Sequence, residues 1–361
     1  MHNADTYRKL NADTYVDVLA EEVPRLFTFS AKDRREAEEW QKAFRPALIK
    51  ALGIEQIANR GPAPLKATCL SVETLEDHVR EEWRLETEPG FQLPFYLLKP
   101  LAAAPAQEGG AGKRLPLVIT PHGHGKLGKR TYVGLWDNED DRQQMMSGER
   151  DVALQAVREG YLAIAPDMRG FAGLRRTKEI NEDANNSCRH LQMHAYLFGR
   201  TLVGERVWDI MRLIDWATAR PDVDARKIVV TGNSGGGTVT LFAGAVDERI
   251  TVSIPGSYFC TFQHSIGSVR HCECNYVPGI MCLGEMYDVA GLIAPRPFMA
   301  VNGNQDRIFP IEAARYAYFR LLEIYRVFGV PERCRLSENE GPHRYYKRDV
   351  WPFVREMLAL V

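Results

Sequence analysis

The sequence has few cysteines and no long apolar run, and both absences narrow what the protein can be. The cysteines number seven in 361 residues, and this odd, sparse set argues against a framework of disulfide bonds. No apolar run approaches the roughly 18–20 residues of a membrane-spanning helix. Residues 1–15 are polar and lack the apolar stretch of a signal peptide. We therefore expect a cytoplasmic protein without a membrane partner; a leader removed from a longer precursor is the alternative.

The sequence also has no excess of charge of either sign. Its 46 lysines and arginines almost balance its 47 acidic residues, which leaves a net charge of -1. This balance gives no electrostatic reason to expect nucleic acid as a partner. The hydrophobic share of 45% and the length suit a globular chain with a large core.

Residues 1–65 read as a polar, helical extension without recognisable chemistry. Ser30, followed by Asp33, suggests a helix start, and apolar side chains then recur at helical spacing up to Phe44. Pro46 should kink or end this helix near Arg45. We expect the extension to pack on the main domain or on another subunit, which leaves a homo-oligomer open.

Residues 66–361 show short apolar runs that alternate with helical segments, after strand-like stretches at 69–86 and 92–99 and a Gly-rich loop at 101–114. The runs predicted as strands are 117–120, 161–165, 228–231, 250–254, 297–302 and 334–338. The helices predicted around them are 149–159, 202–219, 234–246 and 346–360. This alternation predicts an α/β fold, with a mostly parallel sheet covered by helices on both faces.

The strongest chemical signal is Gly232-Asn233-Ser234-Gly235-Gly236, which follows the apolar run IVVT and precedes a helix. A tight strand–turn–helix needs small residues beside the serine and pushes its hydroxyl outward. The helix start also favours developing negative charge. We interpret Ser234 as a nucleophile; the alternative is a capping serine at a Gly-rich helix start.

A nucleophilic serine needs a base, and the base needs an acid that orients it. In this type of fold the order along the chain is serine, acid, histidine. Asp306 follows the run PFMAVN, and His343 follows the last predicted strand and has no C-terminal competitor. We predict these two as acid and base, with Asp288 as the reserve acid. The alternatives are a turn-capping aspartate and a surface histidine.

Two backbone N–H groups should stabilise the oxyanion. One belongs to Gly235, and the other comes from the loop Pro121-His122-Gly123-His124-Gly125, where we choose His124. We expect His122 to hydrogen-bond within that loop. Further candidates for the pocket or its support are aromatic residues and one arginine, for which core packing or a surface position is the alternative: Trp136, Arg169, Tyr258, Phe259 and Tyr276.

The segment His271-Cys272-Glu273-Cys274, with His264 and Cys282 nearby, could be read as metal ligands. A single residue between the cysteines is not the usual zinc spacing of two to four. A serine triad also needs no metal. We therefore expect neither a metal nor a cofactor.

From about residue 70 onward the chain resembles bacterial α/β-hydrolases around the acetyl xylan esterases and dienelactone hydrolases, most closely an acetyl xylan esterase-like branch. The segments that carry the resemblance are PFYLLKP, PLVITPHGHG, AIAPDMRGFAG, DWATARPDVDARKIVVTGNSGGG, HCECNYVPGI, IAPRPFMAVNGNQDRIFP and EGPH. It implies Ser234, Asp306 and His343 as the triad. The cephalosporin C deacetylase/acetyl xylan esterase family proper has Arg-Gly-Gln, Gly-x-Ser-Gln-Gly and His-Glu. At the same places this chain has Arg169-Gly170-Phe171, Gly235 after the serine, and His343-Arg344. This departure puts acetyl-xylan specificity in question.

The sequence thus predicts a serine esterase, and the resemblance alone suggests short acyl esters of small molecules or carbohydrates as substrates. A serine peptidase or amidase is the first alternative, because the run Asp215–Asp224 is similar to one in prolyl oligopeptidases. A catalytically silent binding protein is the second.

Overall fold

The computed structural model describes residues 12–61, 63–101 and 114–361, and its centre is one nine-stranded sheet. The spatial order of the strands is β1-β2-β3-β5-β4-β6-β7-β8-β9. Strands β1, β2, β3 and β5 pair antiparallel, and every pair from β5 to β9 is parallel. Their bounds are β1 Ala67–Thr74, β2 His78–Glu88, β3 Phe91–Pro100, β4 Leu115–Ile119, β5 Leu162–Pro166, β6 Val223–Asn233, β7 Val252–Gly256, β8 Phe298–Gly303 and β9 Cys334–Asn339.

The parallel strands alternate their apolar side chains between two cores, one on each face of the sheet. In β8, Phe298 and Ala300 enter one core, and Met299 and Val301 enter the other. This period of two explains why the strands of the parallel part are apolar throughout. The predicted fold class and the predicted strands are therefore confirmed, with shifts of one to a few residues at their ends.

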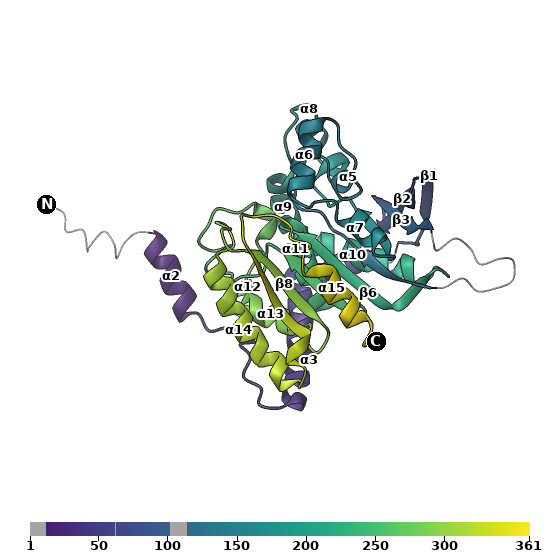
Figure 1. Cartoon of the computed structure of the whole chain (residues 1–361). Helices are drawn as coiled ribbons and strands as arrows, with labels where there is room; N and C mark the ends of the chain where they lie inside the picture. Colours follow the sequence, from purple (N-terminus) through teal and green to yellow (C-terminus); the bar gives the residue numbers. More distant parts are fainter. Residues whose placement is uncertain (1–11, 62, 102–113) are drawn as a thin grey trace.

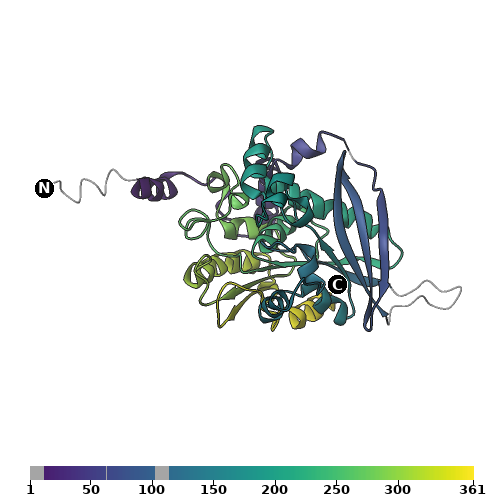
Figure 2. The same ribbon diagram turned by 90° about the horizontal axis from the view of Figure 1, so that it is seen from above.

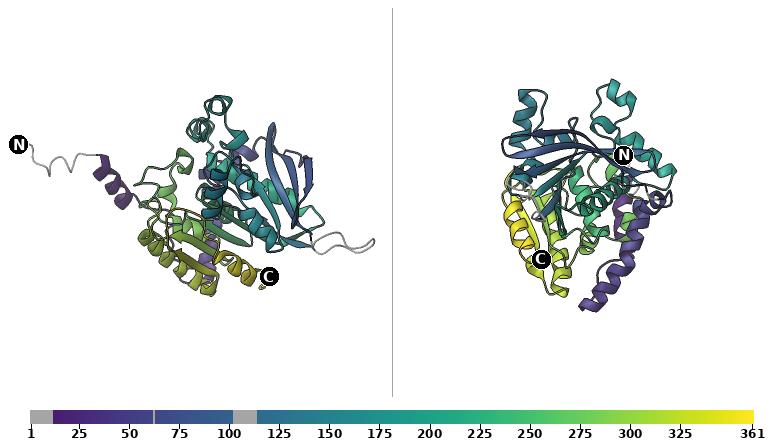
Figure 3. Two further views of the ribbon diagram at one scale, coloured as in Figure 1. Left: turned by 45° about the horizontal axis from the view of Figure 1, so that its top comes forward. Right: turned by 90° about the vertical axis from the view of Figure 1, so that its right-hand side faces the viewer.

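Helices cover both faces of the sheet. The core that contains Phe298 is the larger one, and the helices that pack in it are α3, α10, α11, α13 and α14. Helices α7 and α15 pack in the smaller core on the other face. Figure 3 shows α3 and α15 on opposite sides of the sheet. The bounds are α2 Ala12–Glu22, α3 Arg34–Leu52, α4 Ile54–Ala58, α5 Lys129–Tyr132, α6 Glu139–Ser147, α7 Val152–Arg158, α8 Thr177–Asn181, α9 Cys188–Leu197, α10 Leu202–Thr218, α11 Gly235–Val246, α12 Ile280–Leu283, α13 Met286–Gly291, α14 Ile311–Val327 and α15 Val350–Leu358.

The N-terminal region differs from the prediction at both ends of its helix. Asp33, and not Ser30, is the N-cap of α3, because its carboxylate accepts the N–H of Glu36. The helix also continues through Pro46 to Leu52, so the expected end near Arg45 is wrong. Tertiary contacts outweigh the hydrogen bond lost at Pro46, since Phe44, Leu48 and Leu52 are fully buried in the larger core.

Polar contacts fix α3 to the sheet's helical layer. Gln41 Nε2 donates to the carbonyl oxygens of Gly291 and Ala294, and Arg45 donates to those of Ala245 and Leu292. Helix α2, in contrast, lies apart from the body of the molecule (Figures 1 and 2). Residues 102–113 of the predicted Gly-rich loop lie outside the described residues. Within the described ranges, no helix has the length and apolar character needed to cross a bilayer.

Candidate active site

Ser234 stands at the sharp turn between β6 and α11, as the sequence predicts. Its backbone has φ 56° and ψ -117°, outside the regions that a serine ordinarily adopts. The Ser234 N–H donates to Gly256 O on the neighbouring strand, at 2.8 Å, and the Asn233 N–H donates to Tyr132 Oη, at 3.0 Å. These bonds hold the strained turn and keep the serine at the carboxyl edge of the sheet.

The turn needs its flanking glycines because the loop after β4 presses against it. A Cβ on Gly232 would lie 2.1 Å from Pro121 O, and a Cβ on Gly236 would lie 2.0 Å from the same oxygen. Real side chains do not approach a carbonyl oxygen so closely. The glycines therefore let the loop that carries His124 approach Ser234.

Asp306 and His343, which are 37 residues apart, are brought together at the ends of β8 and β9. His343 Nδ1 lies 2.6 Å from Asp306 Oδ2. The Asp306 side chain is fully buried, and its Oδ1 accepts the N–H groups of Ile308 and Phe309 at 2.9 and 3.1 Å. An aspartate held in this way can fix the orientation and the tautomer of the histidine.

A cavity of about 370 Å³ opens beside Ser234 and His343. His343 Nε2 points away from Asp306 and has no hydrogen-bond partner within the described part of the chain. Its wall combines polar side chains with apolar surface; it comprises His122, Gly123, His124, Gly125, Gly128, Thr131, Tyr132, Arg150, Asn233, Gly235, Arg270, His271, Cys272, Asn275, Ile308 and Phe309. Ser234 and a histidine with an unpaired nitrogen thus line one small cavity.

The loop after β4 and the start of α11 form one side of the cavity, the side for which the sequence predicts the oxyanion hole. Gly235 begins α11, and a Cβ on it would lie 3.2 Å from Nδ1 of the His124 ring. A side chain at this position would crowd the His124 ring. His122 bonds within its loop as expected, since its Nδ1 lies 2.7 Å from Gly123 O, and its Nε2 accepts the N–H of Met168.

The reserve acid Asp288 is engaged elsewhere. Its carboxylate accepts the N–H of Glu285, closing a capping box at the start of α13, and the N–H of Phe29 from the N-terminal region. Burial raises the pKa of Asp288 to about 6. Among the described residues, no hydrogen bond joins it to His343, whereas Asp306 does contact that histidine.

Arg169 is not a surface arginine, and it does not line the cavity. Its guanidinium is buried, makes two hydrogen bonds to Asp209 at 2.7 and 2.8 Å, and reaches Glu88 Oε1 at 2.5 Å. It also lies 3.8 Å from the centre of the Phe91 ring. Arg169 therefore connects the loop after β5 to α10 and to the β2–β3 hairpin, a structural role behind the site.

The four aromatic residues predicted as pocket walls are not among the residues that line the cavity. Trp136 is 40% exposed and stacks with Arg142. Tyr276 is also exposed, and its carbonyl oxygen accepts from Tyr196 Oη. Tyr258 is fully buried, and its ring centre lies 5.2 Å from that of Phe309. For Tyr258, the alternative of core packing is therefore correct. Phe259, likewise completely buried, packs against Phe298.

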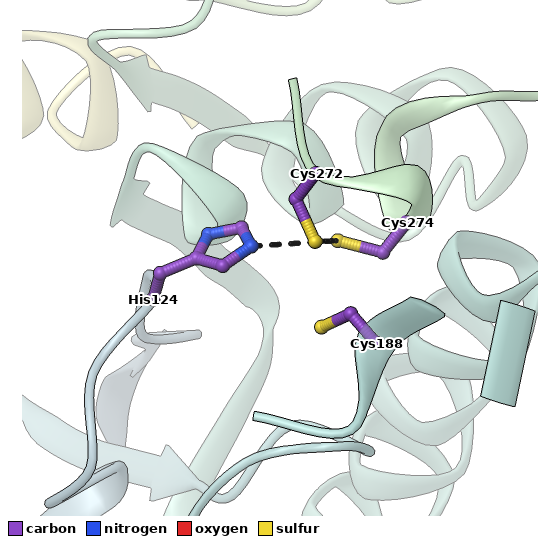
Figure 4. A group of neighbouring side chains, drawn as sticks. All are labelled: His124, Cys188, Cys272 and Cys274. Carbon is purple, nitrogen blue, oxygen red and sulfur yellow. Dashed lines mark hydrogen bonds between the residues drawn. The ribbon is translucent and has the colours of Figure 1, made fainter. Parts of the chain in front are cut away.

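A second cluster of reactive side chains adjoins the cavity, and local sequence reasoning missed it. His124, Cys188, Cys272 and Cys274 direct their side chains toward one another, and their nitrogen and sulfur atoms all lie within 4.8 Å (Figure 4). Burial would lower the pKa of His124, but hydrogen bonds with Cys272 and Cys274 raise it to about 9. His264 and Cys282, which the sequence placed nearby, do not belong to the cluster.

The sheet order and a serine at the strand–helix turn define an α/β-hydrolase fold. The chain belongs to the abhydrolase family, whose family model matches residues 3–325. YtaP of Bacillus subtilis (strain 168), provisionally named a hydrolase, is 26% identical over 286 residues, which cover 78% of this chain and 87% of YtaP. A 4-O-methyl-glucuronoyl methylesterase of Phanerochaete carnosa (strain HHB-10118-sp) is 33% identical over 120 residues, 26% of this chain and 30% of that protein.

Solved structures share the fold at low sequence identity. A protein of Bacteroides fragilis NCTC 9343, provisionally described as an acetyl xylan esterase, superposes with a TM-score of 0.71 at 19% identity, covering 92% of this chain and 82% of its own. A glucuronoyl esterase from Solibacter usitatus gives 0.63 at 16% identity, with 93% and 97% covered. These similarities agree with the resemblance found in the sequence.

Proposed function

We propose that this protein is a serine hydrolase of carboxylic esters, with Ser234 as nucleophile, His343 as base and Asp306 as the acid that orients it. One observation carries the proposal. The His343–Asp306 pair leaves Nε2 of the imidazole unpaired in the cavity that the strained Ser234 also faces. A hydrogen bond between serine and histidine often forms only when substrate is bound.

The reaction follows from this arrangement. His343 removes the proton of Ser234 as the serine attacks the ester carbonyl, and Asp306 stabilises the imidazolium that results. Backbone N–H groups of Gly235 and His124 hold the oxyanion, each worth about a hundred- to a thousandfold in rate. His343 then protonates the leaving alcohol, and water cleaves the acyl-enzyme by the same steps.

The cavity favours a short acyl group on a polar alcohol. Its volume of about 370 Å³ is at the low end for a ligand pocket, which suits a short chain better than a long one. Arg150 and Arg270 supply positive charge, which suits the carboxylate product. Names of similar proteins favour carbohydrate esters, either acetylated sugars or methyl esters of glucuronic acid.

The test measures hydrolysis of p-nitrophenyl acetate, acetylated xylose and methyl glucuronate by the purified chain. We expect turnover of the acetate esters, and Ser234→Ala should abolish it while leaving the fold intact by circular dichroism. Labelling by a fluorophosphonate should occur in the wild type only, which a silent binding protein would not show. Wild-type activity in Ser234→Ala would disprove the assignment, and faster cleavage of a matched amide would favour the peptidase alternative.

A further inference from the structure

Three cysteines and a histidine meet beside the cavity, although an ester-hydrolysing triad has no use for them. His124 comes from the loop after β4, and Cys188 is the first residue of α9. Cys272 precedes a single 3-10 turn before α12, and Cys274 lies within that turn. Cys188 and Cys274 are almost completely buried. We propose that these four residues form a binding site for one Zn²⁺ ion.

The distances suit a tetrahedral ion. Zn–S bonds of about 2.3 Å and Zn–N bonds of about 2.0 Å require ligand atoms roughly 3.5–3.8 Å apart. In the cluster, the sulfurs of Cys272 and Cys274 are 3.4 Å apart, and Cys274 Sγ lies 3.6 Å from His124 Nε2. All pairs lie within 4.8 Å, so small side-chain shifts complete the geometry.

A buried cation supplies independent evidence for negative charge at this place. Arg206 is only 2% exposed, and among the described residues no carboxylate lies within ion-pair distance of it. Its guanidinium donates to Arg169 O and, at 3.3 Å, to Cys188 Sγ. A buried charge without a counter-charge is costly. Three thiolates with Zn²⁺ leave one negative charge, which Arg206 neutralises.

The ligand set selects the type of metal and its role. Thiolates and imidazole bind Zn²⁺ well, whereas Mg²⁺ and Ca²⁺ prefer oxygen ligands. A monovalent ion would leave excess negative charge beside the single cation of Arg206. Four protein ligands also close the coordination sphere, as in structural rather than catalytic zinc sites. The usual spacing of zinc-binding cysteines does not predict this site, because only two of its four ligands, Cys272 and Cys274, are close in sequence.

The site would stabilise the part of the loop that the proposed reaction uses. His124 would ligate the ion through its side chain and stabilise the oxyanion through its backbone N–H, next to Gly235. Cys272 is part of the cavity wall. A bound ion would therefore join the loop after β4 to the wall on the opposite side, a consequence that rests on the proposed function.

The decisive experiment measures metal content in the purified full-length chain by mass spectrometry, after growth with added zinc. We expect about one zinc per chain, as in a closed four-ligand site. Cys274→Ser and Cys188→Ser should lose most of it. Cys334→Ser is the matched control, since Cys334 is equally buried but lies outside the cluster, and it should retain the full content.

A further measurement on the wild type keeps the proposal falsifiable if a variant does not fold. The wild type, stripped of metal and titrated with Co²⁺, should develop thiolate charge-transfer absorption that saturates at one equivalent. A disulfide between Cys272 and Cys274 with no metal uptake, or full zinc content in Cys274→Ser, would overturn the site.

Activity then separates this site from the proposed function. Removal of zinc by a chelator should lower kcat for p-nitrophenyl acetate by roughly a hundredfold, the effect of one misplaced oxyanion donor, with a smaller change in KM. Added zinc should restore it. Ser234→Ala should keep its zinc while it is inactive. In the wild type, bound zinc without activity would refute only the esterase, and activity without bound zinc would refute only the metal site.

Discussion

At the scale of single residues, Asp306 and Asp288 show how position decides the role of a carboxylate. Both are buried, and both accept backbone N–H groups. Only Asp306 contacts His343, whereas Asp288 caps α13 and holds Phe29. The two aspartates therefore form a matched pair for testing the proposed triad.

Asp306→Asn should lower kcat by about 10⁴-fold with little change in KM, because an amide holds the wrong histidine tautomer. Asp288→Asn should keep kcat within a factor of about 10, while it lowers stability by roughly 1–3 kcal/mol through the disturbed cap. The measurements are steady-state hydrolysis of p-nitrophenyl acetate and urea unfolding. Equal losses of kcat in the two variants would refute the assignment of Asp306.

At the scale of elements, helix α3 contains Pro46, a residue that is unfavourable inside a helix, because the tertiary contacts of the helix are strong. Pro46 is exposed, removes one helical hydrogen bond, and lies between the buried residues Phe44 and Leu48. The penalty is local, whereas the stabilisation comes from the partners of the helix across the core.

Pro46→Ala should therefore raise the free energy of unfolding by roughly 1–2 kcal/mol, since it restores the bond and the helix propensity. Part of the gain is offset by a more flexible unfolded chain. Lys42→Ala, at an exposed position of the same helix, should change stability by only a few tenths. Urea unfolding followed by circular dichroism measures both, and a destabilised Pro46→Ala would show that the proline is needed for a bend.

At the scale of the whole molecule, the N-terminal region divides into a helix outside the body and one inside the core. Helix α2 lies apart from the sheet, whereas α3 buries Phe44, Leu48 and Leu52 against it. Each such side chain contributes about 1.5–3 kcal/mol, against a total stability of about 5–15 kcal/mol for a typical protein.

Deletion of residues 1–22 should therefore leave thermal stability and activity close to those of the full chain. Deletion of residues 1–52 should abolish cooperative unfolding, because it uncovers the larger core and removes the hydrogen bonds of Gln41 and Arg45. Differential scanning calorimetry compares the two. A folded, active chain that lacks residues 1–52 would show that α3 is dispensable.

The sequence by itself determined what depends on neighbours along the chain. The apolar periods predicted the strands and helices of the sheet, and the glycines around Ser234 predicted its sharp turn. The fold's fixed order of residues was enough to select Asp306 and His343, because each follows a strand whose end lies at the same edge of the sheet.

Tertiary structure alone decided what depends on contacts between distant segments. It buried Arg169 between Asp209 and Glu88, carried α3 through Pro46, and moved Tyr258 into the core. It also brought His124 within 4.8 Å of cysteines that follow it by 64 to 150 residues. Local sequence patterns do not predict these contacts, because the contacts form only when the loops at one edge of the sheet fold over each other.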